Sequence, residues 1–290
     1  MPELPEVETV RRGLEALTVG RRIVAVEVAN PGSFMDDAGP PDSLVGARIE
    51  AVRRRAKLLM VDLADARTLL IHLKMTGQMV VVGVGRWGGG HPSDSLVEGL
   101  PDASTRVILT LCDGSRVFFN DQRKFGWMRL MAHDDVPRLP FVARLGPEPL
   151  EGGAAPEFLR RLRRHPRTSI KAALLNQEVV AGIGNIYADE ALWAAKVHPA
   201  TAVGSVSDRK ARAILDAAIA VMAHSLELGG STDRNYVDAQ GNRGAYLEFA
   251  AVFRRDGQPC RRCGRLIVKT RVAGRGTHLC PRCQRPPRAP

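Results

Sequence analysis

One stretch of sequence decides how the C-terminal region folds: Cys260-Arg261-Arg262-Cys263, followed by Cys280-Pro281-Arg282-Cys283. The two Cys-x-x-Cys pairs are separated by 16 residues, a spacing typical of a zinc site with four thiolate ligands. Residues 266–279 between them have the pattern strand, glycine turn, strand, and Arg275 lies near the predicted tip. We therefore predict a β-hairpin held by one Zn²⁺ ion, because a segment of about 37 residues buries too little apolar surface to fold without a metal.

Disulfide bonds are the alternative for these cysteines. The N-terminus is acidic and lacks the apolar stretch of a signal peptide, so we expect a cytoplasmic protein, in which disulfides are rare. Zinc is therefore the favoured interpretation. The fifth cysteine, Cys112, ends the apolar run 107–112, and we expect it to be a buried, inert thiol.

Positive charge is concentrated in the same C-terminal region. The net charge of the chain is +11, and residues 254–290 contain eleven basic residues but one acidic residue. A basic module on a nearly neutral body indicates a polyanionic partner, most simply nucleic acid. A solvated, solubilising tail is the alternative. No apolar run approaches the roughly 18 residues that span a membrane, so we expect no membrane partner.

The N-terminal half reads as one helix followed by many short strands. Apolar residues recur at helical spacing over residues 4–17. The expected strands are 22–28, 48–53, 58–63, 68–72, 78–82, 106–111, 116–119 and 126–131. Residues 83–105 are rich in Gly, Pro and Ser and are expected to form a surface loop. Many short strands predict a sandwich or a barrel.

The second half has a different organisation. Residues 134–156 carry five prolines and are typical of a linker, and beyond them the apolar pattern becomes helical. We predict an α+β multidomain protein with a β-rich domain over residues 1–133, a linker over 134–156, a helical domain over 157–253 and the zinc hairpin over 254–290.

The N-terminal residues carry the clearest chemical signal. Methionine before proline is normally removed, which leaves Pro2 with a free secondary amine. An α-amine has a reference pKa of about 8, so it is substantially neutral and nucleophilic near pH 7. Attack on a sugar C1′ would give an iminium ion, with Glu3 beside it to donate and accept protons. The alternative is that Pro2 is only a stable terminus, and that Glu6 and Glu8 complement the helix dipole.

Seven motifs in order resemble the bacterial formamidopyrimidine-DNA glycosylase family, which excises oxidised purines. They span nearly the whole chain. The motifs are Met1-Pro2-Glu3-Leu4-Pro5-Glu6-Val7-Glu8-Thr9, Arg55-Ala56-Lys57, His72-Leu73-Lys74-Met75-Thr76-Gly77, Asp121-Gln122-Arg123-Lys124-Phe125-Gly126, Leu145-Gly146-Pro147-Glu148-Pro149-Leu150, Gly182-Ile183-Gly184-Asn185-Ile186-Tyr187 and the four-cysteine hairpin.

The resemblance implies an N-terminal β-sandwich, and a C-terminal helix-two-turn-helix domain with a zinc hairpin. It implies a bifunctional glycosylase and abasic-site lyase in base-excision repair, acting as a monomer on double-stranded DNA with an oxidised base or abasic site. Pro2 would be the nucleophile and Glu3 the proton donor and acceptor, while Lys57 would contact DNA around the lesion. A base buried in a duplex must be extruded before it can react.

Further residues have roles that the resemblance alone implies. Met75, Arg123 and Phe125 would fill the space left by the extruded base, although on pattern alone Met75 and Phe125 are ordinary core residues. Lys124 stands where the family often has a phosphate-binding arginine. The remaining expected DNA contacts are Lys171, Asn185 and Arg275, and Asn185 could equally cap a helix. Residues 232–253 align with a loop that closes over the base in relatives.

Two other functions remain open at this point. Endonuclease VIII-type enzymes prefer oxidised pyrimidines, but their start usually reads Pro-Glu-Gly-Pro, whereas this chain has Pro2-Glu3-Leu4-Pro5. A non-catalytic zinc protein that only binds damaged DNA would have no need for a free Pro2 or an intact Glu3 and Lys57. We therefore favour the oxidised-purine enzyme.

Overall fold

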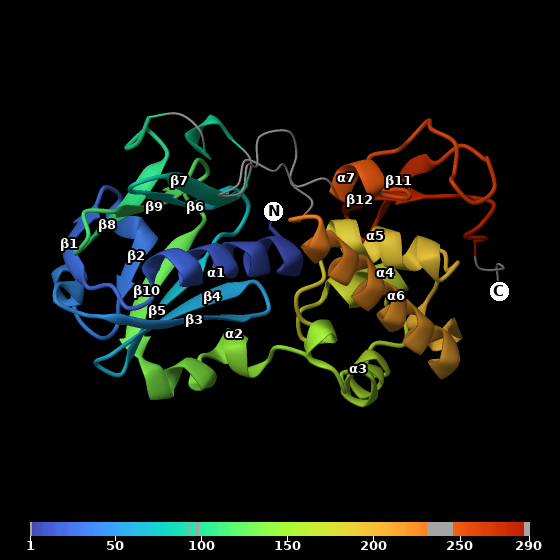
Figure 1. The fold of residues 1–290 in the computed structure, drawn as a ribbon. Helices are drawn as coiled ribbons and strands as arrows, with labels where there is room; N and C mark the ends of the chain where they lie inside the picture. Colours follow the sequence, from blue (N-terminus) through green and yellow to red (C-terminus); the bar gives the residue numbers. More distant parts are fainter. Residues whose placement is uncertain (1, 92, 97–98, 231–245, 287–290) are drawn as a thin grey trace. The chain divides into compact units, whose positions relative to one another are not determined.

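The computed structural model describes residues 2–91, 93–96, 99–230 and 246–286. The chain divides into two compact units (Figure 1). The N-terminal unit comprises Met1–Ala143 with Leu228–Ala245, and the C-terminal unit comprises Arg144–Glu227 with Tyr246–Pro290. Among the described residues, no helix is both long and apolar enough to cross a membrane.

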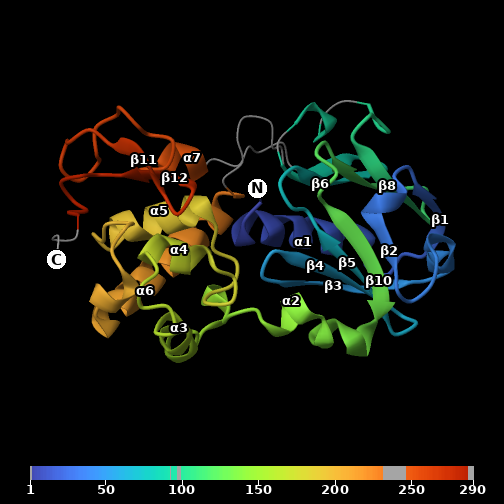
Figure 2. The ribbon, with the colours of Figure 1, turned by 180° about the vertical axis from the view of Figure 1, so that it is seen from behind.

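The N-terminal unit is a β-sandwich with a helix, α1 (Leu4–Thr18), packed on it. One sheet has the order β1 (Ile23–Val28), β8 (Thr105–Leu111), β9 (Arg116–Asp121), β6 (Gly77–Val82) and β7 (Arg86–Gly90). The other, seen from behind in Figure 2, has the order β2 (Phe34–Asp36), β10 (Trp127–Ala132), β5 (Arg67–His72), β4 (Leu58–Leu63) and β3 (Ile49–Arg55). The predicted sandwich is confirmed.

Alternation along the strands builds the core of this sandwich. Leu69 and Ile71 of β5, and Val117 and Phe119 of β9, are all buried in one apolar cluster that joins the two sheets. Helix α1 adds Val7, Val10 and Leu14 to the same cluster, so one stripe of the helix closes it. All neighbouring strands are antiparallel except β2 and β10, which run parallel. Short helices connect them: η1 (Pro31–Ser33), η2 (Pro41–Leu44) and η3 (Asp94–Leu96).

The expectation of a plain surface loop over 83–105 is wrong, because this segment contains strand β7 and η3. Gly88, Gly89 and Gly90 belong to the strand, and Gly89 allows α1 to approach closely. A Cβ atom on Gly89 would lie 2.9 Å from Val10 Cγ2, and one on Gly13 of the helix would lie 2.0 Å from the Trp87 ring. Glycine is needed here because a larger side chain would collide with the helix, but in the sequence a run of glycines looks like a loop.

The expected burial of Cys112 is also wrong, since this residue is exposed. Strand β8 ends at Leu111, one residue earlier. Cys112 therefore begins the turn to β9, where its Sγ accepts the backbone N–H of Arg22 at 3.4 Å.

The C-terminal unit is helical and carries the hairpin (Figure 1). Its elements are η5 (Pro149–Glu151), α3 (Ala155–Leu162), α4 (Ile170–Leu175), α5 (Asn185–Ala194), η6 (Val203–Ser205), α6 (Asp208–Glu227), α7 (Tyr246–Phe249), β11 (Val268–Val272) and β12 (Arg275–Leu279). The proline-rich stretch 134–156 forms short helices, among them η4 (His133–Arg138) and α2 (Pro140–Ala143), and the division between the units falls after Ala143. Together the two units confirm the predicted α+β class.

Replacing Gly13 by alanine tests the close packing of α1 on β7. Alanine favours a helix over glycine by about 1 kcal/mol, but the added Cβ would overlap the buried Trp87 ring. We expect overpacking to dominate and the free energy of unfolding to fall by about 1–3 kcal/mol, measured by denaturant unfolding. Gly85→Ala is the matched control, because nothing lies within 4 Å of a Cβ atom there. A stabilised Gly13→Ala variant would contradict the packing.

Candidate active site and metal centre

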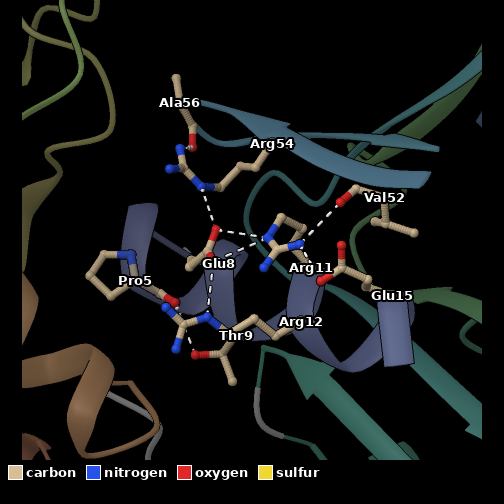
Figure 3. A network of polar contacts seen from close by, with 9 residues as sticks. All are labelled: Pro5, Glu8, Thr9, Arg11, Arg12, Glu15, Val52, Arg54 and Ala56. Atoms are coloured by element: carbon tan, nitrogen blue, oxygen red, sulfur yellow. Dashed lines mark hydrogen bonds and ion pairs between the residues drawn. The ribbon is translucent and has the colours of Figure 1, made fainter. Parts of the chain in front are cut away.

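Helix α1 is aligned antiparallel to strand β3 by arginine contacts (Figure 3). Arg11 Nη1 donates to the Val52 carbonyl at 3.1 Å. Further toward the helix start, Arg54 donates through Nε to Glu8 Oε2 at 3.1 Å and through Nη1 to the Ala56 carbonyl at 2.9 Å. The N-terminus of α1 therefore leads toward the turn after β3, which carries Lys57.

Glu8 is the acceptor at the centre of this network. It also accepts Arg11 Nε at 3.1 Å and Arg12 Nε at 3.0 Å. Burial by itself would raise the pKa of Glu8, but the contacts with Arg12, Arg11 and Arg54 outweigh it, so the pKa lies below its ordinary value. The carboxylate stays charged, and the helix stays tied to the strand.

Pro2 and Glu3 lie at the start of this helix, and both are buried. Glu3 is the N-cap residue and forms a capping box with Glu6, whose Oε2 accepts the Glu3 backbone N–H at 2.8 Å. Glu6 thus has the structural role that its position in the first turn predicts. Lys57 is 7% exposed and follows Ala56, whose φ of 55° makes the tight turn between β3 and β4.

His72 forms a row with the start of β4 and the start of β10. It pairs with Leu58 on one side and with Trp127 on the other, and its ring lies 5.7 Å from the Trp127 ring. Its Nδ1 accepts the Lys74 backbone N–H at 3.0 Å. Burial first, and then the charges of Lys74 and Lys57, lower the pKa of His72 to about 3. This imidazole is therefore neutral between two lysines.

Two turns at the same end of the sandwich carry the expected void-filling residues. Met75 lies in the turn between β5 and β6, residues 73–76, called here the Met75 turn. The Phe125 turn, residues 122–126, joins β9 to β10 and contains Arg123, Lys124 and Phe125. Because Gly77 of β6 pairs with Asp121 of β9, the two turns are neighbours.

Phe125 is not a core residue, since 54% of its surface is exposed. Arg123 is exposed as well, and its guanidinium lies 4.7 Å from the centre of the Phe125 ring. Lys124 is exposed and has a φ of 58°. Met75 is half-buried. An aromatic ring held out in solvent on a turn, with a cation over its face, is not explained by packing in the core.

The sandwich thus gathers Lys57, the Met75 turn and the Phe125 turn at one end, and directs Pro2 and Glu3 toward it. Thr76, Asp121 and His72 belong to the same end. Sequence reasoning quoted these last three within motifs but gave them no role. The one feature of the sequence that points to these three residues is that they lie next to residues with an expected role.

In the C-terminal unit, Asn185 and the hairpin tip are in contact. Asn185 is the first residue of α5, and Gly184 is the N-cap, so Asn185 does not cap the helix. Its Nδ2 donates to the Gly276 carbonyl at 3.0 Å. Arg275 precedes that carbonyl, begins β12 and is exposed.

Lys171 was expected near the DNA, but its side chain is fully buried. Its Nζ donates to Asp189 Oδ1 at 2.6 Å, to Thr277 Oγ1 at 2.8 Å and to the Gly276 carbonyl at 3.0 Å. The ammonium therefore ties the hairpin backbone beside Arg275 to helices α4 and α5.

The four paired cysteines converge, with their sulfur atoms within 4.8 Å of one another. Cys263 and Cys280 Sγ are 3.5 Å apart, and Cys260 and Cys283 Sγ are 4.0 Å apart. Zinc–sulfur bonds of about 2.3 Å in a tetrahedron place sulfurs about 3.8 Å apart. These residues fit one Zn²⁺ ion.

Backbone and indole donors prepare this cluster for a cation. Burial by itself would raise the pKa of Cys260, but N–H donors from Arg262 and Trp193 together outweigh burial and lower the pKa to about 6. Burial and the neighbouring thiols raise the pKa of Cys283 to about 12. Four thiolates cannot coexist at these distances without a divalent ion to neutralise them.

Two arginines of the first Cys-x-x-Cys pair serve the fold. Arg262 donates to the Trp193 carbonyl at 2.9 Å, at the end of α5, and its guanidinium lies 4.0 Å from the centre of the Trp193 ring. Arg261 donates to the Phe249 carbonyl at 2.9 Å, at the end of α7. These cations complement the negative ends of helix dipoles.

Comparisons with known proteins agree with this geometry along the whole chain. The formamidopyrimidine-DNA glycosylase N-terminal domain matches residues 1–128, its H2TH domain matches 145–237, and the zinc finger found in FPG and IleRS matches 257–286. The formamidopyrimidine-DNA glycosylase of Herpetosiphon aurantiacus is 42% identical over 98% of this chain and 100% of its own length. The chain belongs to the formamidopyrimidine-DNA glycosylase family.

Solved structures of family members are similar to this chain as well. Lactococcus lactis Fpg in complex with DNA containing an abasic site has a TM-score of 0.85 and 32% identity, and covers 98% of this chain and 100% of its own. The same values hold for wild-type L. lactis Fpg with DNA containing N7-benzyl-Fapy-dG. Family membership confirms the resemblance seen in the seven motifs, the fold class and the structural zinc site.

Removing one zinc ligand tests the metal centre. We expect Cys280→Ser to lose bound zinc and to lower the melting temperature of the protein, because the hairpin has little apolar core of its own. Metal content by mass spectrometry and thermal unfolding measure the two effects. Cys112→Ser is the matched control, since Cys112 lies outside the cluster, and it should retain one zinc per chain. Equal zinc in both variants would contradict the assignment.

The neutral His72 predicts a stability that depends on pH. Its pKa is about 3 in the fold against 6.5 for the unfolded chain, so the unfolded state binds more protons between these values. Stability is then complete above pH 6.5 and is lost as the pH falls toward 3, by up to about 1.4 kcal/mol per unit. We expect a shallower loss in His72→Asn, whose side-chain oxygen can replace Nδ1 as acceptor. Denaturant unfolding from pH 7.5 to 4.5 measures it, and parallel curves would contradict the prediction.

Proposed function

We infer that this chain is a base-excision-repair DNA glycosylase with abasic-site lyase activity, acting on oxidised purines in duplex DNA. The observation that supports it best is the convergence at one end of the sandwich. Pro2 just before α1, the buried Lys57 and two turns, one of which exposes Phe125, all lie toward the same end. A purely binding protein has no use for the first two of these.

The first chemical step is proposed for Pro2. With Met1 removed, its secondary amine attacks C1′ of the damaged nucleotide, a C–N bond forms, and the glycosidic bond breaks with its electrons on the departing base. Glu3 protonates the sugar ring oxygen as the ring opens to an iminium ion. The helix N-terminus beside Glu3 stabilises its carboxylate between proton transfers.

The iminium ion is an electron sink, and strand cleavage follows from it. Loss of a C2′ proton breaks the C3′–O bond, and a second elimination breaks the C5′–O bond. Each step expels a phosphate, so the product is a one-nucleotide gap flanked by phosphates. Lys57 lies on the turn that α1 approaches. It is proposed to contact the DNA around the lesion and to stabilise the negative charge of the expelled phosphates.

Extrusion of the base is proposed for the Met75 turn and the Phe125 turn. Met75 and Phe125 insert apolar mass between bases, while Arg123 hydrogen-bonds the orphaned partner base. Lys124 offers a phosphate contact as a point charge. Because Phe125 is exposed, insertion between bases explains its position better than a role in the core.

Phosphate binding is proposed for the C-terminal unit. Arg275 and Asn185 would hold the phosphates at the lesion, because Asn185 opens α5 and the hairpin presents Arg275 in solvent. Lys171 would act indirectly, through the Gly276 carbonyl that it shares with Asn185. The loop proposed to cover the extruded base spans residues 232–253, most of which lie outside the described residues. We place the protein with the chromosome in the bacterial cytoplasm, working as a single chain.

Borohydride trapping tests the proposed function. The chain, confirmed by mass spectrometry to begin at Pro2, is mixed with a duplex containing one 8-oxoguanine opposite cytosine and reduced during turnover. We expect a covalent adduct that peptide mapping places on Pro2, and loss of most lyase activity in Pro2→Gly with DNA binding retained. A chain with one uncleaved residue before Pro2 is the matched control, because its Pro2 nitrogen is an amide and should trap nothing.

Other outcomes point to the other functions. Trapping with a thymine-glycol duplex, and none with 8-oxoguanine, would indicate the oxidised-pyrimidine enzyme. Binding of every lesion without an adduct would indicate a damage-binding protein and would refute the proposal.

A further inference from the structure

We propose that Thr76 and Asp121 form a hydrogen-bonded bridge that holds the Met75 turn and the Phe125 turn in one arrangement, so that both enter the duplex together. The proposal rests on the proposed function, since it concerns how the space left by an extruded base is filled. Thr76 is a positioning residue in it, acting through Met75 and Arg123.

The Thr76 hydroxyl uses both its donor and its acceptor for this bridge. It donates to Asp121 Oδ1, and it accepts the backbone N–H of Arg123 at 3.1 Å. Thr76 itself is 9% exposed, so water competes little for these bonds. One hydroxyl thus joins the residue after Met75 to the backbone of the turn that carries Phe125.

The Asp121 carboxylate holds the rest of the Phe125 turn. It is fully buried, and its Oδ1 also accepts the Arg123 N–H at 3.2 Å, while Oδ2 accepts the Gly126 N–H at 2.6 Å. The carboxylate therefore binds the turn on both sides of Phe125. Hydrogen bonds to an ionised acceptor are roughly twice as strong as neutral ones.

The anchor belongs to the sheet rather than to the turns. The Asp121 backbone N–H donates to the Ser104 carbonyl at 2.8 Å, and its carbonyl accepts Arg106 Nε at 2.8 Å. Arg106 is itself buried. Both turns are therefore anchored to one buried residue, Asp121, whose backbone is hydrogen-bonded to Ser104 and Arg106 on the neighbouring segment.

Backbone conformation explains why the turns need such an anchor. Lys74 precedes Met75 with a φ of 49°, and Lys124 precedes Phe125 with a φ of 58°. Both lysines are in the left-handed region, which costs free energy for a residue with a side chain and persists only where the surroundings enforce it. The bridge supplies that constraint to both turns at once.

The two activities should depend on the bridge to different degrees. Excision requires a stacked, paired base to be extruded and replaced. A preformed abasic site has no base to extrude, so strand cleavage there relies less on the void-filling residues. Loosening the turns should therefore slow base excision more than it slows the lyase reaction.

Single-turnover rates of Thr76→Val test this split. The rates are measured on a duplex with 8-oxoguanine opposite cytosine and on the same duplex with a preformed abasic site. We expect excision to slow by about tenfold or more and strand cleavage by no more than about threefold, given what a hydroxyl–carboxylate bond typically contributes. Thr76→Ser, which keeps the hydroxyl, should restore both rates. Thr76→Ala provides the same test with a smaller side chain if valine prevents folding.

Thr68→Val is the matched control. Thr68 is fully buried, and its hydroxyl donates to the Asp62 carboxylate at 2.9 Å in the same unit, but it lies in neither turn. Its loss should leave the ratio of the two rates unchanged. The proposal is overturned if Thr76→Val leaves that ratio unchanged, or if Thr68→Val shifts it equally. An unaltered chain that excises no oxidised purine would overturn the proposed function instead.

Discussion

The hydrogen bonds of Arg54 set the geometry on which the N-terminal site depends. One guanidinium binds Glu8 on the helix and the Ala56 carbonyl in the turn before Lys57. Exposed ion pairs contribute little to stability, but this pair is largely removed from solvent, with Arg54 9% exposed. Its main effect is on register. A helix displaced by one turn would move its first residue by about 5.4 Å, enough to change where Pro2 lies relative to the turn that carries Lys57.

Basic side chains, one of them buried, play a comparable part in the C-terminal unit. Lys171 joins α4 and α5 to the hairpin backbone, and Arg261 and Arg262 bind carbonyls at the ends of two helices. Arg261 and Arg262 therefore support the fold although both side chains are exposed. Arg265, Lys269, Arg271, Arg275, Arg282 and Arg285 are exposed as well. Most of the positive charge that the composition indicates for this segment is thus in solvent, where it is available to a polyanion.

Phe125, Arg123 and Arg275 share a physical requirement, because each is exposed and must still be held in place. Phe125 and Arg123 stack on one another on a strained turn, and a buried carboxylate beneath them binds the backbone on both sides. Arg275 is held the same way, through the carbonyl of Gly276. In both cases the exposed side chain is positioned by hydrogen bonds to the backbone of its turn or of the next residue. The residues that provide this support lie outside the turn, so the composition of the turn does not predict it.

The sequence alone determined the zinc ligands, eight of the ten sandwich strands that the structure describes, the amphipathic N-terminal helix and the family, since ligand spacing and hydrophobic period are local properties of a chain. Apart from Pro2, Glu3 and the zinc ligands, the roles of individual residues came only from the resemblance, and the catalytic and DNA-binding roles stay proposals. Tertiary structure decided what depends on distant partners: the exposure of Cys112 and Phe125, the burial of Lys171, and the strand formed by Gly88, Gly89 and Gly90. Glycine in a strand and glycine in a loop look alike until the helix that needs the space is in place. Likewise, Thr76 and Asp121 are 45 residues apart in sequence, and only the pairing of β6 with β9 brings their side chains together.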